Sequence, residues 1–213
     1  MDETAVTVRG VRTVGPETVA IEFETPTAFE AEPGQFVQLI ADLEDEEVAR
    51  FYTLSSPDVT DTFEVTVAVD PEGEFGPYLE ALEQGDTVRV KGPFGDSYYR
   101  GEDAAVVLAG GPGIGPAVAI AERVLAEDGE TAIVYQDGGL VHEDRLSGIA
   151  TAGGDVFVVD ESFGDAVAAA LAAVPGAVFV FGFAEFVEQS KNALVAAGFD
   201  IEDAAFESFG PAP

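Results

Sequence analysis

Short runs of alternating apolar and polar residues follow one another through the first half of the chain. They are rich in β-branched and aromatic side chains, as in Glu64-Val65-Thr66-Val67, and turn residues such as Gly15-Pro16 separate them. The runs cover residues 5–12, 18–24, 35–39, 51–55, 62–69 and 87–91, and one short helical stretch covers residues 77–82. Six short strands at this spacing predict a closed antiparallel β-barrel.

The second half shows a different pattern, in which apolar runs alternate with helical segments. Strands are expected over residues 105–109, 132–135, 156–160, 178–181 and 204–206, and helices over residues 116–127, 144–150, 165–173 and 184–197. This alternation predicts a parallel α/β sheet with helices on both faces. Because no low-complexity linker separates the halves, we expect two closely packed domains, residues 1–101 and residues 102–213.

The composition is typical of a folded protein. Of the 213 residues, 47% are hydrophobic and 16 are Phe, enough for a sizeable core. Cysteine is absent, which excludes structural disulfides, thiol nucleophiles and cysteine-ligated zinc or iron–sulfur centres within this chain. The sequence shows no other cluster with metal-ligand spacing, so no metal site is expected.

The charge is strongly one-sided, with 41 acidic against 9 basic residues and a net charge of -32. Nucleic acids and anionic membranes are not expected as partners, because both require clustered Lys and Arg. Molar salt shortens the Debye length to about 3 Å and screens such a surface. The even spread of carboxylates therefore favours a salt-rich cytoplasm, as in a halophile; the alternative is an acidic docking protein for a basic partner.

The N-terminus and the apolar stretches bear on location. Met1-Asp2-Glu3 lacks the basic and apolar features of a signal peptide, and no apolar stretch approaches the length of a membrane span. We therefore expect a cytoplasmic protein without membrane insertion.

A glycine-rich segment, Gly110-Gly111-Pro112-Gly113-Ile114-Gly115-Pro116, connects a predicted strand to a predicted helix. Glycines there permit a sharp turn and a close approach of the backbone to a ligand. The free N–H groups at the start of the helix suit a phosphate or pyrophosphate. The alternative is a βα turn that binds nothing.

Two further segments of the first half carry candidate chemistry. Arg50-Phe51-Tyr52-Thr53-Leu54-Ser55-Ser56 places a cation, aromatic rings and hydroxyls on one extended run, which suits an anionic ligand. Strand alternation predicts Arg50, Tyr52 and Leu54 on one face and Phe51, Thr53 and Ser55 on the other. Gly73-Glu74-Phe75-Gly76 precedes a short helix, and its amides also suit phosphate. The alternatives are a surface arginine beside an ordinary strand and a plain turn.

The order of these motifs resembles the ferredoxin–NADP reductase superfamily over essentially the whole chain. The motifs are Arg50–x–Tyr52–Thr53–x–x–Ser56, residues 73–76, Gly92-Pro93-Phe94-Gly95, the glycine-rich segment 110–116, Phe181-Gly182-Phe183 and Glu207-Ser208-Phe209. The resemblance implies a barrel that binds FAD and a second domain that binds a nicotinamide nucleotide. It also implies hydride transfer between nicotinamide C4 and flavin N5.

The same resemblance implies roles for individual residues. Arg50 is expected to neutralise the flavin pyrophosphate, and Tyr52 to lie against the isoalloxazine or to hydrogen-bond the ribityl chain. Thr53 is expected near flavin N5 and, with Glu207, forms the candidate catalytic pair. The other residues expected at the cofactors are Phe51, Leu54, Ser55, Ser56, Gly73, Gly76, Gly111, Pro112, Gly113, Ile114, Asp137, Phe181, Gly182 and Phe209.

The chain departs from the family pattern at a few positions. Gly76 replaces a common Ser, which leaves only a backbone contact to phosphate. Phe181 replaces a common Cys beside the nicotinamide, where its ring is expected either to obstruct hydride transfer or to stack. Two residues keep alternative interpretations: Glu207 as a plain surface carboxylate, and Phe209 as a cover for the flavin or as packing.

Asp137 lies at the end of the second strand of the α/β domain, about 20 residues after the glycine-rich segment. A carboxylate there accepts a hydrogen bond from a ribose 2′-OH and repels a 2′-phosphate, which favours NADH over NADPH. Arg145 and His142 are alternative partners for a 2′-phosphate. His142 itself is interpreted as a solvated loop residue rather than a catalytic base, and the acidic residues 42–47 as a solvated loop.

The leading functional hypothesis is an FAD-dependent NAD(P)H oxidoreductase. The chain carries no iron–sulfur cysteines, so the acceptor is expected to be separate: a ferredoxin, a partner oxygenase, another subunit or a small molecule. One alternative is a flavin reductase that releases reduced flavin. Another is a non-catalytic regulatory module, which Phe181 favours.

Overall fold

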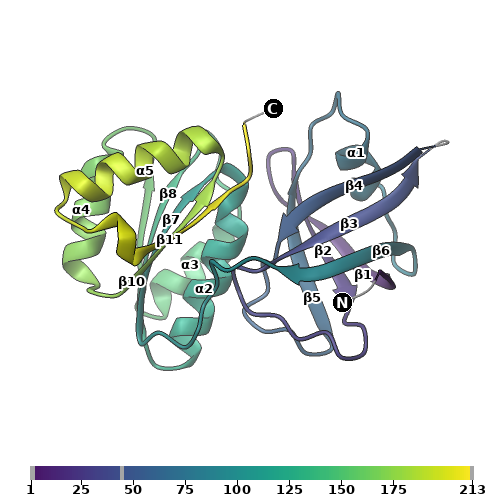
Figure 1. Cartoon of the computed structure of the whole chain (residues 1–213), viewed down its shortest axis with the longest axis horizontal. Coiled ribbons are helices and arrows are strands. Elements are labelled where there is room, and N and C mark those ends of the chain that lie inside the picture. The colour runs from purple at the N-terminus through teal and green to yellow at the C-terminus, as the bar shows by residue number, and fades with distance from the viewer. Residues whose placement is uncertain (1–2, 44–45, 212–213) are drawn as a thin grey trace.

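The computed structural model describes residues 3–43 and 46–211 and contains two sheets side by side (Figure 1). The first sheet is antiparallel, with the strand order β4-β3-β6-β1-β2-β5. Its strands are β1 (Thr4–Gly15), β2 (Thr18–Glu24), β3 (Phe36–Leu43), β4 (Glu46–Thr53), β5 (Thr62–Ala68) and β6 (Thr87–Phe94). A short helix, α1 (Phe75–Glu80), follows β5 and begins two residues earlier than the sequence pattern predicts.

The edges of this sheet meet, as the prediction of a barrel requires. Leu54, directly after β4, forms an isolated antiparallel bridge with Val65 of β5, and the Ser55 N–H donates to the Glu64 carbonyl at 2.8 Å. The enclosed space is filled by fully buried side chains such as Phe23, Leu39 and Phe63. The predicted six-stranded, barrel-like domain is confirmed.

Residues 42–43 and 46–47 of the acidic segment belong to paired strands and not to the loop that we predicted, although Asp42, Glu46 and Glu47 are exposed to solvent as predicted. Asp42 pairs with Glu47, and Leu43 pairs with Glu46, across β3 and β4; residues 44–45 lie outside the described residues. Arg89 of β6 forms ion pairs with Asp42 at 2.9 Å and Glu47 at 3.0 Å. The positive charge of Arg89 offsets the repulsion between the facing carboxylates of Asp42 and Glu47, so the two strands can pair there.

The second sheet is parallel, with the strand order β11-β10-β7-β8-β9. Its strands are β7 (Ala104–Gly110), β8 (Glu130–Gln136), β9 (Asp155–Val159), β10 (Ala177–Gly182) and β11 (Ala204–Ser208). Helices α2 (Ile114–Ala126) and α3 (Glu143–Thr151) cover one face, and α4 (Phe163–Ala173) and α5 (Ala184–Ala196) cover the other (Figure 1). The predicted α/β architecture with helices on both faces is confirmed.

Each face of the parallel sheet has its own core. Val107 and Ile133 pack with the helices α2 and α3, whereas Val106 and Val134 pack with α4 and α5. The central strands therefore read as continuous apolar runs, because both faces are buried. Within residues 3–43 and 46–211, no helix is long and apolar enough to cross a membrane.

Candidate functional site

A cavity of about 710 Å³ lies between the barrel and the second sheet. Its barrel wall comes from β3, β4, β5 and α1 with the segment before it. Its opposite wall comes from the glycine-rich turn, the end of β11 and the residues that follow β10 and β11. It is lined by Phe36, Arg50, Phe51, Tyr52, Thr53, Thr66, Ala68, Asp70, Gly73, Glu74, Phe75, Gly76, Pro112, Phe183, Glu207, Ser208, Phe209 and Gly210.

Arg50 brings a positive charge to the cavity wall. Its guanidinium Nη1 donates to its neighbour's carbonyl, that of Ala49, at 2.8 Å. Among the described residues no carboxylate pairs with it, although most other cations of the chain have an acidic partner. A free guanidinium in so acidic a protein suits an anionic ligand.

Tyr52 and Thr53 place two hydroxyl groups on the same wall. Tyr52 is half-buried with its ring tilted on that of Phe75, the centroids 6.3 Å apart. Burial raises the pKa of Tyr52 to about 12, so its hydroxyl stays protonated and can donate a hydrogen bond. Thr53, the last residue of β4, is 9% exposed and lines the cavity.

The predicted alternation fails after Thr53, because β4 ends there. Leu54 and Ser55 are both fully buried and sit where the barrel closes, so neither lines the cavity. The Ser55 Oγ donates to Glu64 Oε1 at 2.9 Å, and the Ser56 Oγ accepts from the Glu64 N–H at 2.7 Å. The two serines therefore support the cavity wall from behind.

The segment before α1 brings Gly73 and Gly76 to the cavity, as predicted. At Gly76 a Cβ atom would lie 3.3 Å from the Val69 Cα and 3.4 Å from the Asp70 N. The close approach of these two backbone segments leaves little room for a side chain at this position.

The C-terminal segment places Glu207 and Phe209 on the other wall. Burial, followed by the nearby carboxylate of Asp96, raises the pKa of Glu207 above its ordinary value. Glu207 is thus a half-buried group of the cavity and not a plain surface carboxylate. The Phe209 ring meets the Phe183 ring edge-on at 6.1 Å, and its N–H donates to the Gly182 carbonyl at 2.9 Å.

Each glycine of the 110–116 turn is required for a different structural reason. The Phe186 ring lies where a Cβ of Gly110 would be, at 2.4 Å, and the Phe181 carbonyl lies 2.1 Å from a Cβ of Gly113. Gly111 has a φ of 53°, in the left-handed region that favours glycine. Pro112 lines the cavity, whereas Ile114 is fully buried in the core of the second sheet.

Phe181 is fully buried in that same core and does not line the cavity. Its Cζ lies 3.3 Å from the position of a Cβ on Gly34. The structure therefore does not bring the ring into the cavity, where it was expected to obstruct or to stack. Gly182, which follows it, contributes its carbonyl to Phe209 and does not line the cavity either.

Asp137 follows β8 and accepts a hydrogen bond from the Tyr135 hydroxyl at 2.8 Å. It does not line the cavity, but Gln136, the residue before it, pairs in register with Gly110 of β7. Asp137 and the glycine-rich turn thus lie at the same carboxyl edge of the sheet, where parallel α/β sheets bind ligands.

His142 is buried, not solvated as we predicted. It is 3% exposed, and its Nε2 lies 2.8 Å from the Thr66 Oγ1 of the barrel. Burial, then Arg145 and Arg12, lower the pKa of His142 to about 3, so the ring is neutral. The packing of the two sheets against each other encloses this residue, an effect that sequence alone does not reveal.

Several cavity residues were not predicted, among them Phe36, Thr66, Asp70 and Phe183. Thr66 had a sequence signal, because it is the polar residue within the apolar run Val65-Thr66-Val67. Phe183 follows the predicted Gly182 directly in sequence, whereas Phe36 reaches the cavity only through the fold.

A family model described as "Oxidoreductase FAD-binding domain" matches residues 5–99. A glycine betaine monooxygenase reductase subunit of Chromohalobacter salexigens is 38% identical over 97 residues, which are 44% of this chain and 26% of that protein. NADH-cytochrome b5 reductase 1 of Laccaria bicolor is 31% identical over 118 residues, which are 53% of this chain and 38% of that protein. The matched stretches thus span well under two thirds of these relatives.

Solved structures resemble the whole chain. Flavohemoglobin of Malassezia yamatoensis, with bound FAD and heme, has a TM-score of 0.81 at 22% identity, over 99% of this chain and 61% of that one. The FAD/NAD binding domain of nitric oxide dioxygenase from Vibrio cholerae has a TM-score of 0.80 at 19% identity, over 97% of this chain and 98% of that one. At these identities the likeness establishes the fold.

Proposed function

We propose that the chain is a member of the ferredoxin reductase-like family and an FAD-dependent NAD(P)H oxidoreductase with a separate electron acceptor. The match of residues 5–99 to an oxidoreductase FAD-binding domain supports this proposal. FAD, when bound, accepts a hydride from a nicotinamide nucleotide and releases electrons singly. We assign flavin binding to residues 1–101 and nucleotide binding to residues 102–213.

The observation that carries the proposal is Arg50, which has no carboxylate partner among the described residues and lines a cavity large enough for a cofactor. In our assignment its guanidinium binds the flavin pyrophosphate, and the backbone of Gly73 and Gly76 meets the same phosphates. Tyr52 offers an apolar ring with a donor hydroxyl, and Phe209 offers a second ring from the opposite wall.

Thr53 and Glu207 supply the proton-handling groups of the cavity. The Thr53 hydroxyl can donate or accept, and it lies at the end of a fixed strand. Because the pKa of Glu207 is raised, a larger share of its side chains holds a proton at the Oε atoms than an exposed glutamate would. We propose that these two residues hold hydrogen bonds at the reacting edge of the flavin.

The second sheet supports NADH as the preferred nucleotide. We place its phosphates at the turn formed by Gly111, Pro112 and Gly113, and its adenosine ribose at Asp137. Arg145 is held by two carboxylates and His142 is buried, so neither is free to meet a 2′-phosphate. NADH is also the nucleotide in the name of the cytochrome b5 reductase relative.

An exposed aromatic cluster beside the cavity supports a protein acceptor. Phe51 is 61% exposed and Phe94 is 39% exposed, and both rings lie against Phe36 with centroids 5.5 and 5.8 Å away. Phe36 and Phe51 also line the cavity. We propose that this cluster receives the acceptor, which shortens the path for electrons out of the cavity. Relatives named as reductase subunits of a monooxygenase fit a protein acceptor.

An anaerobic absorption spectrum in molar KCl, taken before and after the addition of NADH, tests the proposal. We expect a bound flavin whose band bleaches on mixing, faster with NADH than with NADPH. A band that stays oxidised contradicts the proposal in favour of a non-catalytic module. Turnover that occurs only with added, freely exchanging flavin contradicts it in favour of a flavin reductase.

Arg50→Met provides a matched variant for the same test. Because a charge-assisted hydrogen bond contributes about 1.5–3 kcal/mol, we expect FAD affinity to fall about 10- to 100-fold. The control is Arg9→Met, which removes an exposed ion pair with Glu24 on the same barrel and is expected to leave FAD affinity unchanged. Flavin fluorescence titration measures both constants.

A further inference from the structure

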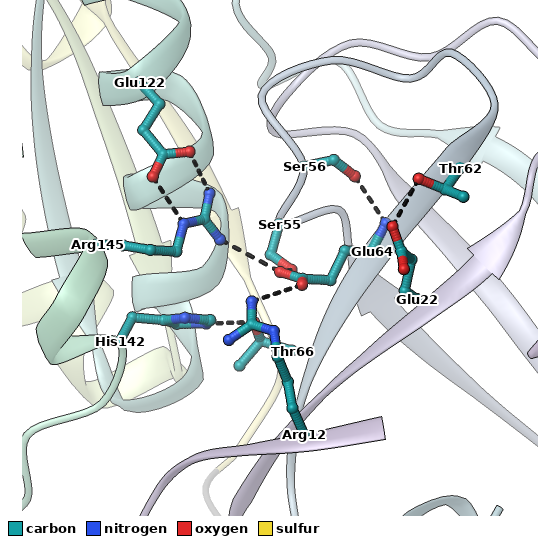
Figure 2. Close-up of polar contacts among 10 residues, drawn as sticks. All are labelled: Arg12, Glu22, Ser55, Ser56, Thr62, Glu64, Thr66, Glu122, His142 and Arg145. Atoms are coloured by element: carbon teal, nitrogen blue, oxygen red, sulfur yellow. Dashed lines mark hydrogen bonds and ion pairs between the residues drawn. The ribbon is translucent and has the colours of Figure 1, made fainter. Parts of the chain in front are cut away.

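Arg145 bridges the two domains by hydrogen bonds to Glu122 and Glu64 (Figure 2). From α3 it forms a two-point contact with Glu122 of α2, with Nε to Oε1 at 2.8 Å and Nη2 to Oε2 at 2.6 Å. Its remaining nitrogen, Nη1, donates to Glu64 Oε1 of β5, in the barrel, at 3.2 Å. One guanidinium thus joins two helices of the second domain to one strand of the first.

Glu64 is the barrel side of this bridge. Its carboxylate also accepts from Arg12 Nη2 at 2.6 Å and from the Ser55 hydroxyl at 2.9 Å (Figure 2). The side chains of Glu64 and Arg145 are each only 15% exposed, so solvent and salt screen their attraction less than that of surface pairs. Through Ser55 the bridge reaches the chain two residues beyond Thr53, which lines the cavity.

A second contact lies two residues further along β5, on the same face of the strand. The Thr66 Oγ1 meets His142 Nε2 at 2.8 Å, and Thr66 itself lines the cavity. Beside it, a Cβ on Gly115 would lie 2.9 Å from the Thr66 side chain, so the first turn of α2 rests directly on β5. We name these contacts the seam: Glu64, Thr66, Gly115, Glu122, His142 and Arg145.

The seam joins the barrel wall to the turn before α2, and the distance between these two parts matters for the proposed reaction. Thr53 and Thr66 belong to the barrel wall, and Pro112 belongs to the turn that leads into α2. A hydride donor and acceptor must approach to about 3–3.5 Å, and a displacement of about 1 Å can cost 100-fold in rate. A rigid seam beside the cavity therefore sets how closely a nucleotide on one sheet meets a flavin on the other.

We propose that Arg145 is a positioning residue for hydride transfer, because it holds α2 and its glycine-rich turn at a fixed distance from the barrel through Glu64. This inference rests on the proposed function. It predicts that breaking the bridge slows the transfer step while each cofactor still binds its own domain.

The variants are Arg145→Met and Glu64→Gln, with Glu24→Gln as the matched control. Glu64→Gln keeps the shape of the side chain and removes its charge, so it tests the bridge even if Arg145→Met folds poorly. Glu24 is also a barrel glutamate paired with an arginine, Arg9, but the pair is exposed and lies within one domain. In stopped-flow at saturating NADH we expect bleaching to slow about tenfold or more in both bridge variants and to be unchanged in the control. FAD and NADH dissociation constants are expected to stay within about twofold of the unaltered protein.

A distance measurement provides a readout that does not depend on activity. The chain has no cysteine, so Glu83→Cys on the barrel and Ala168→Cys on α4, both exposed, accept spin labels cleanly. With FAD bound, pulsed electron paramagnetic resonance is expected to show a broader label-to-label distribution in the bridge variants than in the Glu24→Gln control.

An unchanged distance distribution, or an unchanged bleaching rate, overturns the inference and leaves the proposed function intact. Absence of NADH-dependent bleaching in the unaltered protein overturns the proposed function, and the positioning role with it. Slower bleaching with a broader distribution supports the positioning role.

Discussion

At the scale of single residues, the neutral, buried His142 gives the protein a built-in sensitivity to acid. Its Nε2 has a partner in Thr66, whereas its Nδ1 is buried without one among the described residues. Protonation would place a charge in a buried site, and beside Arg145 and Arg12, which explains the low pKa of His142. The unfolded chain carries no such penalty.

This difference predicts a pH-dependent stability. The pKa of His142 falls from an ordinary 6.5 to about 3 on folding. Between these pH values the side chain is therefore protonated in the unfolded chain and neutral in the folded chain. The free energy of unfolding should therefore fall between pH 6.5 and pH 3, by about 1.4 kcal/mol per pH unit from this group. Urea unfolding at several pH values measures the slope.

His142→Asn isolates the contribution of the histidine, because asparagine tolerates the positive φ of 57° at this position. The variant should lose this part of the slope while the many carboxylates keep theirs. Equal slopes in the two proteins would refute the assignment.

At the scale of elements, the sequence pattern predicted the bounds of several strands and helices closely. The bounds of β2, Thr18–Glu24, match the prediction, and α5 differs by one residue at its end. Residues 46–50 of β4 were not predicted as strand, because Glu46, Glu47 and Arg50 are polar and lie on an edge strand that solvent reaches. Its hydrogen-bonded pairing with β3 and the ion pair of Arg89 with Glu47 stabilise it as a strand despite its polar composition.

The sequence predicted the position of the glycine-rich turn, but it did not predict why glycine is needed there. Closeness to phosphate was the expected reason, whereas Gly110 and Gly113 make room for Phe186 and for the Phe181 backbone. Gly115 makes room for Thr66 of the other domain. Such contacts join residues far apart in the chain, so no local pattern reports them.

Gly115→Ala tests the contact between α2 and β5. The new methyl group would lie 2.9 Å from Thr66, so we expect a loss of about 1–3 kcal/mol in the free energy of unfolding. Gly148→Ala, in α3 with open space around it, is the control and should instead stabilise by about 0.5–1 kcal/mol. Urea unfolding of both variants decides; a Gly115→Ala protein as stable as Gly148→Ala would contradict the packing argument.

At the scale of the whole molecule, the two-domain fold could be predicted from the change of pattern near residue 102, but the seam could not. Arg145 and Glu64 are 81 positions apart, and His142 and Thr66 are 76 apart. In the sequence analysis, Arg145 was one of two candidate partners for a 2′-phosphate, with His142. Only the fold shows that the carboxylates of Glu64 and Glu122 already occupy it.

The net charge of -32 predicts that the stability of the whole molecule depends on salt. Like charges spread over the surface repel one another, and molar KCl shortens the Debye length to about 3 Å. We expect the melting temperature to rise from low to molar KCl, measured by circular dichroism. Sucrose at matched osmolality serves as the uncharged control; an equal rise in both would show that the effect is not electrostatic.

Thr66 belongs at once to the cavity wall and to the seam. Under the proposed function, a flavin and a nucleotide bound in this cavity would both act on the contact between the domains, and any linkage between their equilibrium binding constants would be reciprocal. If flavin raises the affinity for the nucleotide by a given factor, the nucleotide raises the affinity for flavin by the same factor. One threonine thus makes the seam a place where two binding equilibria can be coupled.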